Sequence, residues 1–116
     1  MIPAPRRGDL AIDSITPEEL NALLRRGQAP VILDVRNLDE VAICRLPGSK
    51  VIPLAELPDR LGELDPTAPM VVHCKSGGRS QRAIAFLEQQ GFARLKNLSG
   101  GILAWIRDVD PSLQSY

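Results

Sequence analysis

An apolar run leads directly into a glycine-containing loop at Met70-Val71-Val72-His73-Cys74-Lys75-Ser76-Gly77-Gly78-Arg79-Ser80. The run shows no alternation of apolar and polar residues, which is typical of a strand covered on both faces in a parallel sheet. A second run of this kind, Val31-Ile32-Leu33-Asp34-Val35, lies earlier in the chain. We therefore expect two central strands, with Cys74 at the junction between the second strand and the helix that follows it.

The segments around these two strands alternate between helical and extended patterns. A helix start is clearest at Thr16-Pro17-Glu18-Glu19, where Thr16 can cap the helix and Glu19 completes a capping box. Further strands are expected near residues 13–15, 51–52 and 95–98, and further helices over 37–44, 57–64, 80–91 and 102–106. This alternation predicts an α/β fold with a mainly parallel sheet of about five strands and helices on both faces.

The length of 116 residues suits a single domain. Residues 1–12 contain two prolines, followed by Arg6, Arg7 and Gly8, and show no periodicity. They are therefore interpreted as a leader or the remnant of a linker. Residues 13–116 are expected to form the domain. Apolar residues make up 44% of the chain and charged residues 24%, which is close to average usage in folded proteins.

The composition also argues against several classes of partner. The chain has 14 basic and 14 acidic side chains, whereas nucleic-acid-binding proteins normally carry a basic excess. No apolar run approaches the roughly 20 residues that span a bilayer, and the first residues lack the apolar core of a signal peptide. We therefore expect a cytoplasmic protein that binds neither nucleic acid nor membrane.

Cysteine and histidine are too scarce for a disulfide scaffold or a closed metal site. Cys44, Cys74 and His73 could supply at most three soft ligands, one short of a structural zinc site. Neither a metal nor another cofactor is expected. His73 is expected to be a packed, hydrogen-bonded residue rather than a general base. Consecutive side chains of a strand point to opposite faces, so its ring should face away from the Cys74 sulfur.

Three features around Cys74 favour its thiolate form. The following helix directs its positive end toward the loop, Gly77 and Gly78 allow consecutive N–H groups to turn inward, and Lys75 and Arg79 add positive charge. Cys74 is therefore predicted to be a nucleophile that is activated without a neighbouring base. The alternative is a buried cysteine without a chemical role, because most free cysteines are small buried apolar residues.

Two kinds of anion chemistry use a cysteine on such a loop. In cysteine phosphatases five residues separate the Cys from an Arg that binds the phosphoryl oxygens. Here four residues separate Cys74 from Arg79, and the tighter ring of amides is better sized for the terminal sulfur of a persulfide. An Asp placed to protonate a phosphate ester's leaving group is not evident. Sulfur transfer is therefore favoured, with a phosphatase or arsenate reductase as an alternative.

Four segments of the chain, in the same order, resemble the rhodanese-like domain. They are Leu33-Asp34-Val35-Arg36 with Glu40, Leu46-Pro47-Gly48-Ser49 leading to Ile52-Pro53, the loop from Cys74 to Ser80, and Gly100-Gly101-Ile102-Leu103-Ala104-Trp105. The resemblance spans residues 13–109. It implies that Cys74 carries sulfur as a persulfide, taken from thiosulfate or from a protein persulfide. It also implies a substrate-binding loop made of Lys75, Ser76, Gly77, Gly78, Arg79 and Ser80.

Within that loop, Lys75 and Arg79 are expected to orient an anionic donor. Ser76 and Ser80 either donate hydroxyl groups to the persulfide or cap the helix. Cys44 is either a buried residue or a resolving thiol that would form a disulfide with the persulfide-carrying cysteine.

Two further positions at the end of the first central strand are expected to support the site. Asp34 and Arg36 should fix loops through ion pairs or hydrogen bonds, with Glu40 as the partner of Arg36 at helical spacing. Trp105 is expected in the core rather than stacked on a substrate.

Two segments resemble a narrower group, the rhodanese domains at the carboxyl end of ubiquitin-activating-like adenylyltransferase/sulfurtransferases. These segments are Cys44-Arg45-Leu46-Pro47-Gly48 and the ending Asp110-Pro111-Ser112-Leu113-Gln114-Ser115-Tyr116. Such proteins act in molybdopterin, thiamine or thiolated-tRNA synthesis. The resemblance implies an upstream adenylyltransferase domain and a ubiquitin-like sulfur-carrier protein as acceptor. A noncatalytic module that docks or regulates a partner is the main alternative function.

Overall fold

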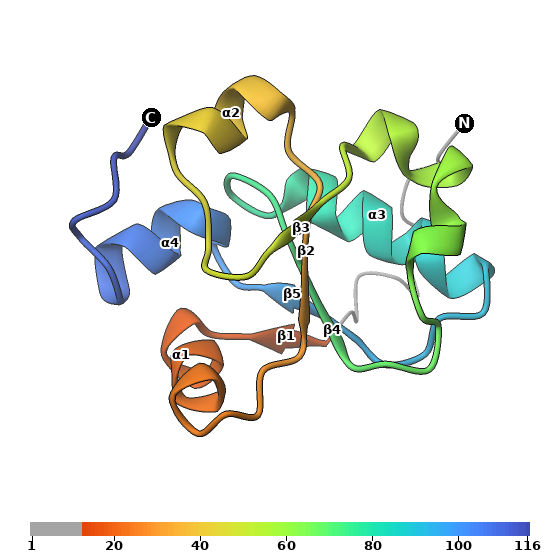
Figure 1. Cartoon of the computed structure of the whole chain (residues 1–116), viewed down its shortest axis with the longest axis horizontal. Helices are drawn as coiled ribbons and strands as arrows, with labels where there is room; N and C mark the ends of the chain where they lie inside the picture. Colours follow the sequence, from red (N-terminus) through yellow and green to blue (C-terminus); the bar gives the residue numbers. More distant parts are fainter. Residues whose placement is uncertain (1–12) are drawn as a thin grey trace.

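The computed structural model describes residues 13–116, so the predicted leader at residues 1–12 lies outside the described residues. A five-stranded sheet with the order β1-β5-β4-β2-β3 forms its centre (Figure 1). The strands are β1 (Ser14–Ile15), β2 (Val31–Asp34), β3 (Lys50–Val51), β4 (Met70–His73) and β5 (Leu95–Leu98). Every pair of neighbouring strands is parallel. The α/β prediction is confirmed, and the sheet is parallel throughout rather than mainly parallel.

The register of the sheet places three chain segments together at its carboxyl edge. Strand β4 lies between β2 and β5, with Asp34 opposite His73 and Asn97 opposite Val72. Cys74 follows β4 directly. Because parallel strands end at the same edge, Cys74 lies beside the last residues of β2 and β5, where ligands bind in open parallel sheets.

Four α-helices connect or follow the strands: α1 (Pro17–Arg25), α2 (Leu38–Ile43), α3 (Gly78–Gln89) and α4 (Gly101–Asp108). The predicted capping box of α1 is present, since the Thr16 hydroxyl accepts from the Glu19 N–H and the Glu19 carboxylate accepts from the Thr16 N–H. The helix expected over residues 57–64 is wrong. Two short 3-10 segments, η2 (Leu54–Asp59) and η3 (Leu61–Glu63), occupy this region. The helical segment begins at Leu54, and Pro58 inside it lacks the N–H that an α-helix begun there would need for its bond to the Leu54 carbonyl.

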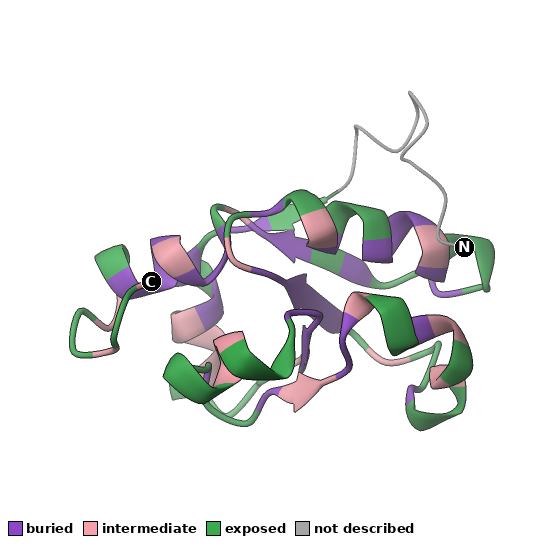
Figure 2. Ribbon diagram, turned by 90° about the horizontal axis from the view of Figure 1, so that it is seen from above, coloured by how far each residue is buried: buried purple, intermediate pink, exposed green. Residues whose placement is uncertain are grey.

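The helices cover both faces of the sheet, as predicted. Along β4, Val72 packs with residues of α3, η2 and η3, whereas Val71 packs on the other face with residues of α1 and α4. Figure 2 shows the buried strands between the helices, whose outer surfaces are exposed. Trp105 belongs to the core on the α1 and α4 side and is 3% exposed, which confirms its predicted core position.

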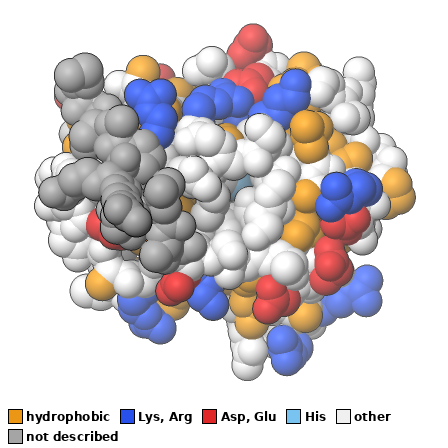
Figure 3. All heavy atoms as spheres, turned by 180° about the vertical axis from the view of Figure 1, so that it is seen from behind, with side chains coloured by type: hydrophobic (Ala, Val, Ile, Leu, Met, Phe, Trp, Pro, Cys, Tyr) orange, Lys and Arg blue, Asp and Glu red, His pale blue; other side chains and the backbone are white. Residues whose placement is uncertain are grey.

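The surface carries both signs of charge. Figure 3 shows Lys and Arg side chains interspersed with Asp and Glu side chains on the face opposite to that of Figure 1. Such a mixed surface is what a chain with equal numbers of acidic and basic residues is expected to present. Between residues 13 and 116, no helix has the length and apolar character needed to cross a membrane.

Candidate active site

The Cys74 sulfur lies inside a tight loop between β4 and α3. The residue is only 1% exposed. The Gly77 N–H donates to its Sγ at an N···S distance of 3.1 Å, and the Ser80 Oγ lies 3.5 Å from Sγ. Gly77 has a φ of +128°, a conformation that L side chains rarely adopt, so glycine at this position lets the peptide turn its N–H toward the sulfur. The loop thus surrounds the sulfur with donors.

These donors change the acidity of the thiol. Burial raises the pKa of Cys74, but hydrogen bonds from the Ser80 hydroxyl and from the backbone N–H groups of Ser80, Gly77 and Ser76 lower it by more. The pKa of Cys74 is therefore below the ordinary value for a thiol. A larger thiolate fraction makes the sulfur a better nucleophile near neutral pH.

The N-terminus of α4 holds the start of this loop. The Ile102 N–H donates to the Cys74 carbonyl at 3.0 Å, and the Leu103 N–H donates to the Lys75 carbonyl at 3.2 Å. Gly101, with a φ of +62°, passes so close that an added Cβ would overlap the Lys75 carbonyl oxygen and lie 2.7 Å from the Cys74 oxygen. The two carbonyls are satisfied on the α4 side, which leaves the following N–H groups to face the sulfur.

Arg79 and Lys75 lie at the rim of the loop, and both contact other residues. Arg79 forms a two-pronged ion pair with Glu40, at 2.6 and 2.8 Å. The Tyr116 hydroxyl donates to Glu40 at 2.9 Å, and the Lys75 ammonium lies 4.5 Å from the centroid of the Tyr116 ring. The Arg79 ion pair and the hydrogen bonds from the Asn37 N–H and the Tyr116 hydroxyl lower the pKa of Glu40 to about 2, although burial opposes this change. Glu40 therefore fixes the position of Arg79.

The expected ion pair between Arg36 and Glu40 is wrong. Arg36 instead binds the Asp34 carboxylate, with distances of 2.7 to 3.1 Å, and both side chains are fully buried. Arg36 also donates to the backbone carbonyls of Glu40 at 3.3 Å and Cys44 at 2.8 Å. Arg36 precedes α2 and points into the molecule, so it does not share a helix face with the Glu40 carboxylate. Asp34 and Arg36 fix the surrounding loops, as predicted.

The His73 ring contacts this buried group rather than the Cys74 sulfur. Its Nε2 lies 3.6 Å from the Asp34 carboxylate, and its Nδ1 lies 3.2 Å from the Cys74 carbonyl oxygen. Burial lowers the pKa of His73, although the Asp34 charge opposes this change. The ring is therefore neutral near pH 7 and is placed as a packed, hydrogen-bonded residue, in agreement with the sequence-based interpretation.

Asn97 and Tyr116 belong to the site but were not identified from the sequence. Asn97 Oδ1 accepts from the Ser80 hydroxyl at 2.6 Å. The Ser80 hydroxyl also donates to the Gly77 carbonyl at 3.0 Å. Gly77 is the N-cap residue of α3, and no side chain makes a capping hydrogen bond at this helix N-terminus. The capping alternative for Ser80 is therefore wrong. The available signal for Asn97 was a polar amide inside a short apolar strand.

Cys44 lies on the other face of the sheet. It is 6% exposed and packs with residues of α1 and α4, whereas Cys74 packs with residues of α3. The sheet therefore separates the two thiols, and both are free. This placement favours the buried-residue interpretation of Cys44 over the resolving thiol.

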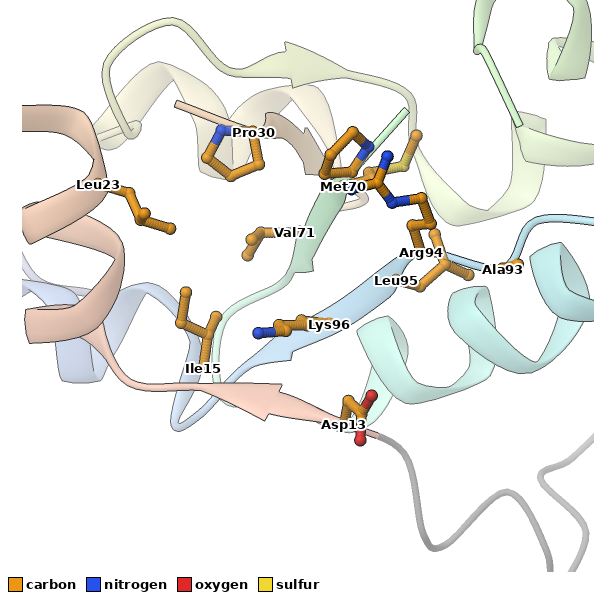
Figure 4. A pocket seen from close by; sticks show the side chains of 11 residues that line it. Asp13, Ile15, Leu23, Pro30, Met70, Val71, Ala93, Arg94, Leu95 and Lys96 are labelled. Atoms are coloured by element: carbon orange, nitrogen blue, oxygen red, sulfur yellow. The ribbon is translucent and has the colours of Figure 1, made fainter. Parts of the chain in front are cut away.

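Two hollows among the described residues lie at opposite ends of the strands. One, of about 430 Å³, is polar and is lined by residues of the Cys74 loop together with Asn97 and Ser99. The other, of about 330 Å³, lies at the amino ends of β4 and β5 and is lined mainly by apolar groups such as Met70, Val71 and Leu95 (Figure 4). The first hollow adjoins the loop that holds Cys74, so we assign the chemistry to the carboxyl edge. In the described residues no cluster of His, Cys, Asp or Glu is arranged to hold a metal.

Comparisons with known proteins agree with this geometry. The family model for the rhodanese-like domain matches residues 16–108. The chain is 36% identical to the thiosulfate sulfurtransferase GlpE of Pseudomonas fluorescens, over 78% of this chain and 82% of that protein. It is also 36% identical to the adenylyltransferase and sulfurtransferase MOCS3 of Arabidopsis thaliana, over 88% of this chain and 25% of that protein.

A solved structure shows the same fold. A rhodanese-like domain protein from Staphylococcus aureus superposes with a TM-score of 0.79 at 31% identity, over 90% of this chain and 99% of that chain. The chain spans between 23% and 38% of the length of several longer curated relatives. The match of the family model over most of the described residues, with the cysteine loop at the carboxyl edge of a parallel sheet, shows that this chain belongs to the rhodanese-like domain family of sulfurtransferases.

Proposed function

We propose that the chain is a sulfurtransferase that carries sulfane sulfur as a persulfide on Cys74. In the first step the Cys74 thiolate attacks the outer sulfur of thiosulfate. A new sulfur–sulfur bond forms, the bond to the sulfonate sulfur breaks, and sulfite leaves with the electron pair. In the second step a nucleophile such as cyanide or a thiol attacks the outer sulfur of the persulfide, and the Cys74 thiolate leaves.

The donor set around the Cys74 sulfur is the observation that carries this proposal. The Gly77 N–H and the Ser80 hydroxyl lie where they can stabilise negative charge on a sulfur. Such preorganised donors lower the energy of an anionic intermediate without rearrangement. Arg79, fixed by Glu40 at the rim, and Lys75 supply positive charge for an anionic donor such as thiosulfate.

Mass spectrometry of the intact protein tests the first step. After treatment with thiosulfate, the wild-type chain should gain the mass of one sulfur atom on Cys74, and cyanide should remove it as thiocyanate. Cys74→Ala should gain no sulfur, whereas Cys44→Ala should gain as much as the wild type. An intact Cys74 that takes up no sulfur would support the noncatalytic docking module instead. Hydrolysis of a phenyl phosphate without persulfide formation would support a phosphatase.

We further propose that the physiological acceptor is a ubiquitin-like sulfur-carrier protein. The similarity to MOCS3 of Arabidopsis thaliana, whose name joins adenylyltransferase and sulfurtransferase, supports this acceptor. The persulfide would attack the adenylated carboxyl terminus of the carrier and displace adenylate, and a thiol would then release the carrier as a thiocarboxylate. A molybdopterin-type pathway and a reducing compartment such as the cytoplasm, which keeps both thiols free, suit this cycle.

The acceptor proposal has its own test. Persulfidated chain is mixed with a ubiquitin-like carrier, an adenylyltransferase, ATP and a thiol, and the carrier is weighed by mass spectrometry. The expected product is a carrier thiocarboxylate that Cys74→Ala does not form. A carrier that stays unchanged while cyanide still removes the sulfur would exclude this acceptor and leave the sulfurtransferase proposal intact.

A further inference from the structure

A chain of polar contacts runs from Asn97 through Ser80 to the Cys74 sulfur. Asn97 Oδ1 accepts from the Ser80 Oγ at 2.6 Å, and the same Oγ lies 3.5 Å from the Cys74 Sγ. The three residues are 7%, 0% and 1% exposed, respectively. Asn97 itself lies on β5, the strand next to β4, and does not touch the sulfur. Apart from through-space electrostatics, the influence of Asn97 on Cys74 therefore passes through the Ser80 hydroxyl.

The Ser80 hydroxyl has one proton and several neighbouring acceptors. These are Asn97 Oδ1, the Gly77 carbonyl at 3.0 Å and the Cys74 Sγ. While Cys74 is a thiol, its S–H can donate to Ser80 Oγ, and the Ser80 proton is then free for Asn97. Once Cys74 is a thiolate or a persulfide anion, the sulfur needs the Ser80 proton. Asn97 Oδ1 would then face the Ser80 oxygen with no proton between them, which is unfavourable in a buried site.

An asparagine can resolve this conflict because its amide carries an acceptor and a donor of similar size. A half-turn about the Cβ–Cγ bond exchanges the positions of Oδ1 and Nδ2, and Nδ2 then donates to Ser80 Oγ while the Ser80 proton points to the sulfur. The Asn97 side chain also lines the polar hollow of about 430 Å³, which gives the amide an open neighbour for its other half. No covalent bond changes, and the thiol proton passes to solvent.

We propose that Asn97 is a positioning residue whose amide turns from acceptor to donor toward Ser80 when the Cys74 sulfur becomes anionic. This inference deepens the proposed function, since it concerns the anionic states through which Cys74 would pass. It differs from a simple packing role in one respect: the hydrogen bonds of the Asn97 amide must follow the charge on Cys74.

The direct experiment is a pH titration of the full chain, without any sulfur donor, followed by ¹⁵N nuclear magnetic resonance of the side-chain amides. The Asn97 amide signal, assigned by its loss in Asn97→Asp, should shift with the same midpoint as Cys74. The Cys74 midpoint itself is read from the rate of alkylation by iodoacetamide. The signal of Asn21 on α1 serves as the matched control and should not follow this midpoint. In Ser80→Ala the Asn97 signal should also lose its response.

Two substitutions separate the amide turn from packing. Asn97→Asp keeps the shape but can only accept, so the Cys74 midpoint should rise by about one pH unit or more. In a Ser80→Ala background this rise should fall to about half, because only the through-space effect of the charge remains. Asn97→Leu, which neither accepts nor donates, serves as a second variant and should move the midpoint less than Asn97→Asp.

The proposal is overturned if the Asn97 amide ignores the Cys74 titration, or if Asn97→Asp shifts the midpoint equally with and without the Ser80 hydroxyl. A loss of thermal stability in Asn97→Leu with an unmoved amide response in the wild type would assign Asn97 a packing role only. Because the titration needs no sulfur transfer, failure of this proposal leaves the persulfide proposal standing, and failure of persulfide formation leaves the titration readable.

Discussion

Cys44 and Cys74 are both buried, yet the polar contacts around them point in different directions. Cys44 follows α2 in an extended conformation, and its backbone carbonyl accepts from Arg36 at 2.8 Å. At Cys74 the sulfur itself accepts, from the Gly77 N–H at 3.1 Å. Both cysteines are held through their backbone carbonyls, but only at Cys74 does the sulfur also accept a hydrogen bond from the backbone. Burial does not distinguish a structural cysteine from a nucleophile, whereas the direction of the neighbouring donors does.

The largest expected difference is in sulfur transfer. Cys74→Ser should reduce the formation of thiocyanate from thiosulfate and cyanide to the uncatalysed level, because the attacking sulfur is gone. Cys44→Ser should keep a rate close to that of the wild type, since the sheet separates Cys44 from the loop. Steady-state thiocyanate assays on both variants measure this contrast. Equal losses in the two variants would mean that Cys44 takes part in the cycle.

The next largest effect is on stability at the Cys44 side. Arg36→Leu leaves the buried Asp34 carboxylate without its partner and also removes the donor to the Cys44 carbonyl. We expect the free energy of unfolding to fall by about 3–5 kcal/mol, as is typical when one member of a buried ion pair is removed. Urea denaturation measures this fall in the free energy of unfolding. The double variant Asp34→Asn/Arg36→Leu should regain part of the loss, and a single-variant loss below about 1 kcal/mol would contradict a buried pair.

A glycine pair tests how firmly the Cys74 loop is held. Gly101→Ala places a methyl group against the Lys75 carbonyl, while Gly91→Ala, with a similarly positive φ of +94°, has no heavy atom within 4 Å of its Cβ. Gly91→Ala should cost about 1 kcal/mol of unfolding free energy for the backbone conformation alone. Gly101→Ala should cost roughly 3 kcal/mol, because steric overlap adds to that strain. It should also slow alkylation of Cys74 by displacing the donors, which Gly91→Ala should not do.

The smallest expected effect is the acid sensitivity of the pair between Glu40 and Arg79 beside Cys74. The pKa of Glu40 falls from its ordinary value of 4.5 to about 2 on folding, so the pair stabilises the fold fully above pH 4.5. That contribution, roughly 2 kcal/mol for a pair that is partly screened by water, is lost as the pH falls toward 2. Glu40→Gln should be less stable at neutral pH and should approach the wild type at the acid end.

Urea denaturation between pH 2 and pH 6 measures this dependence. Glu63 provides a matched control, because its pKa is also lowered to about 2 by Arg60, but its ion pair is exposed. High salt should weaken the contribution of Glu63 more than that of Glu40, since exposed pairs are screened more strongly. The same salt response at both positions would place the Glu40 pair in bulk-like solvent.

The fold was largely predictable because uninterrupted apolar runs identify central parallel strands. The bounds of β4 and β5 match the expected segments, and the position of Cys74 follows from them. The region around Pro58 was not predictable as 3-10 structure, because a short apolar pattern fits both kinds of helix and tertiary packing selects between them.

Contacts within the site were less predictable than its location. Sequence spacing suggested an ion pair between Arg36 and Glu40. The direction of the chain before α2 instead points the Arg36 side chain toward Asp34, and Glu40 pairs with Arg79. Asn97 is separated from Ser80 by 17 residues, and a single sequence gives no register between β5 and the loop. Local patterns therefore identify the nucleophile, while long-range packing chooses the residues that orient it.

The contact between the N-terminus of α4 and the carbonyls of Cys74 and Lys75 also has a consequence for the order of folding. The nucleophile is encoded well before the helix that holds its loop, so the donor ring depends on contacts between distant parts of the chain. In a nascent or locally opened chain in which α4 has not docked, we expect the Cys74 loop to be less ordered and the thiol to be less activated. Docking of α4 would then limit adventitious oxidation or sulfuration of incomplete chains.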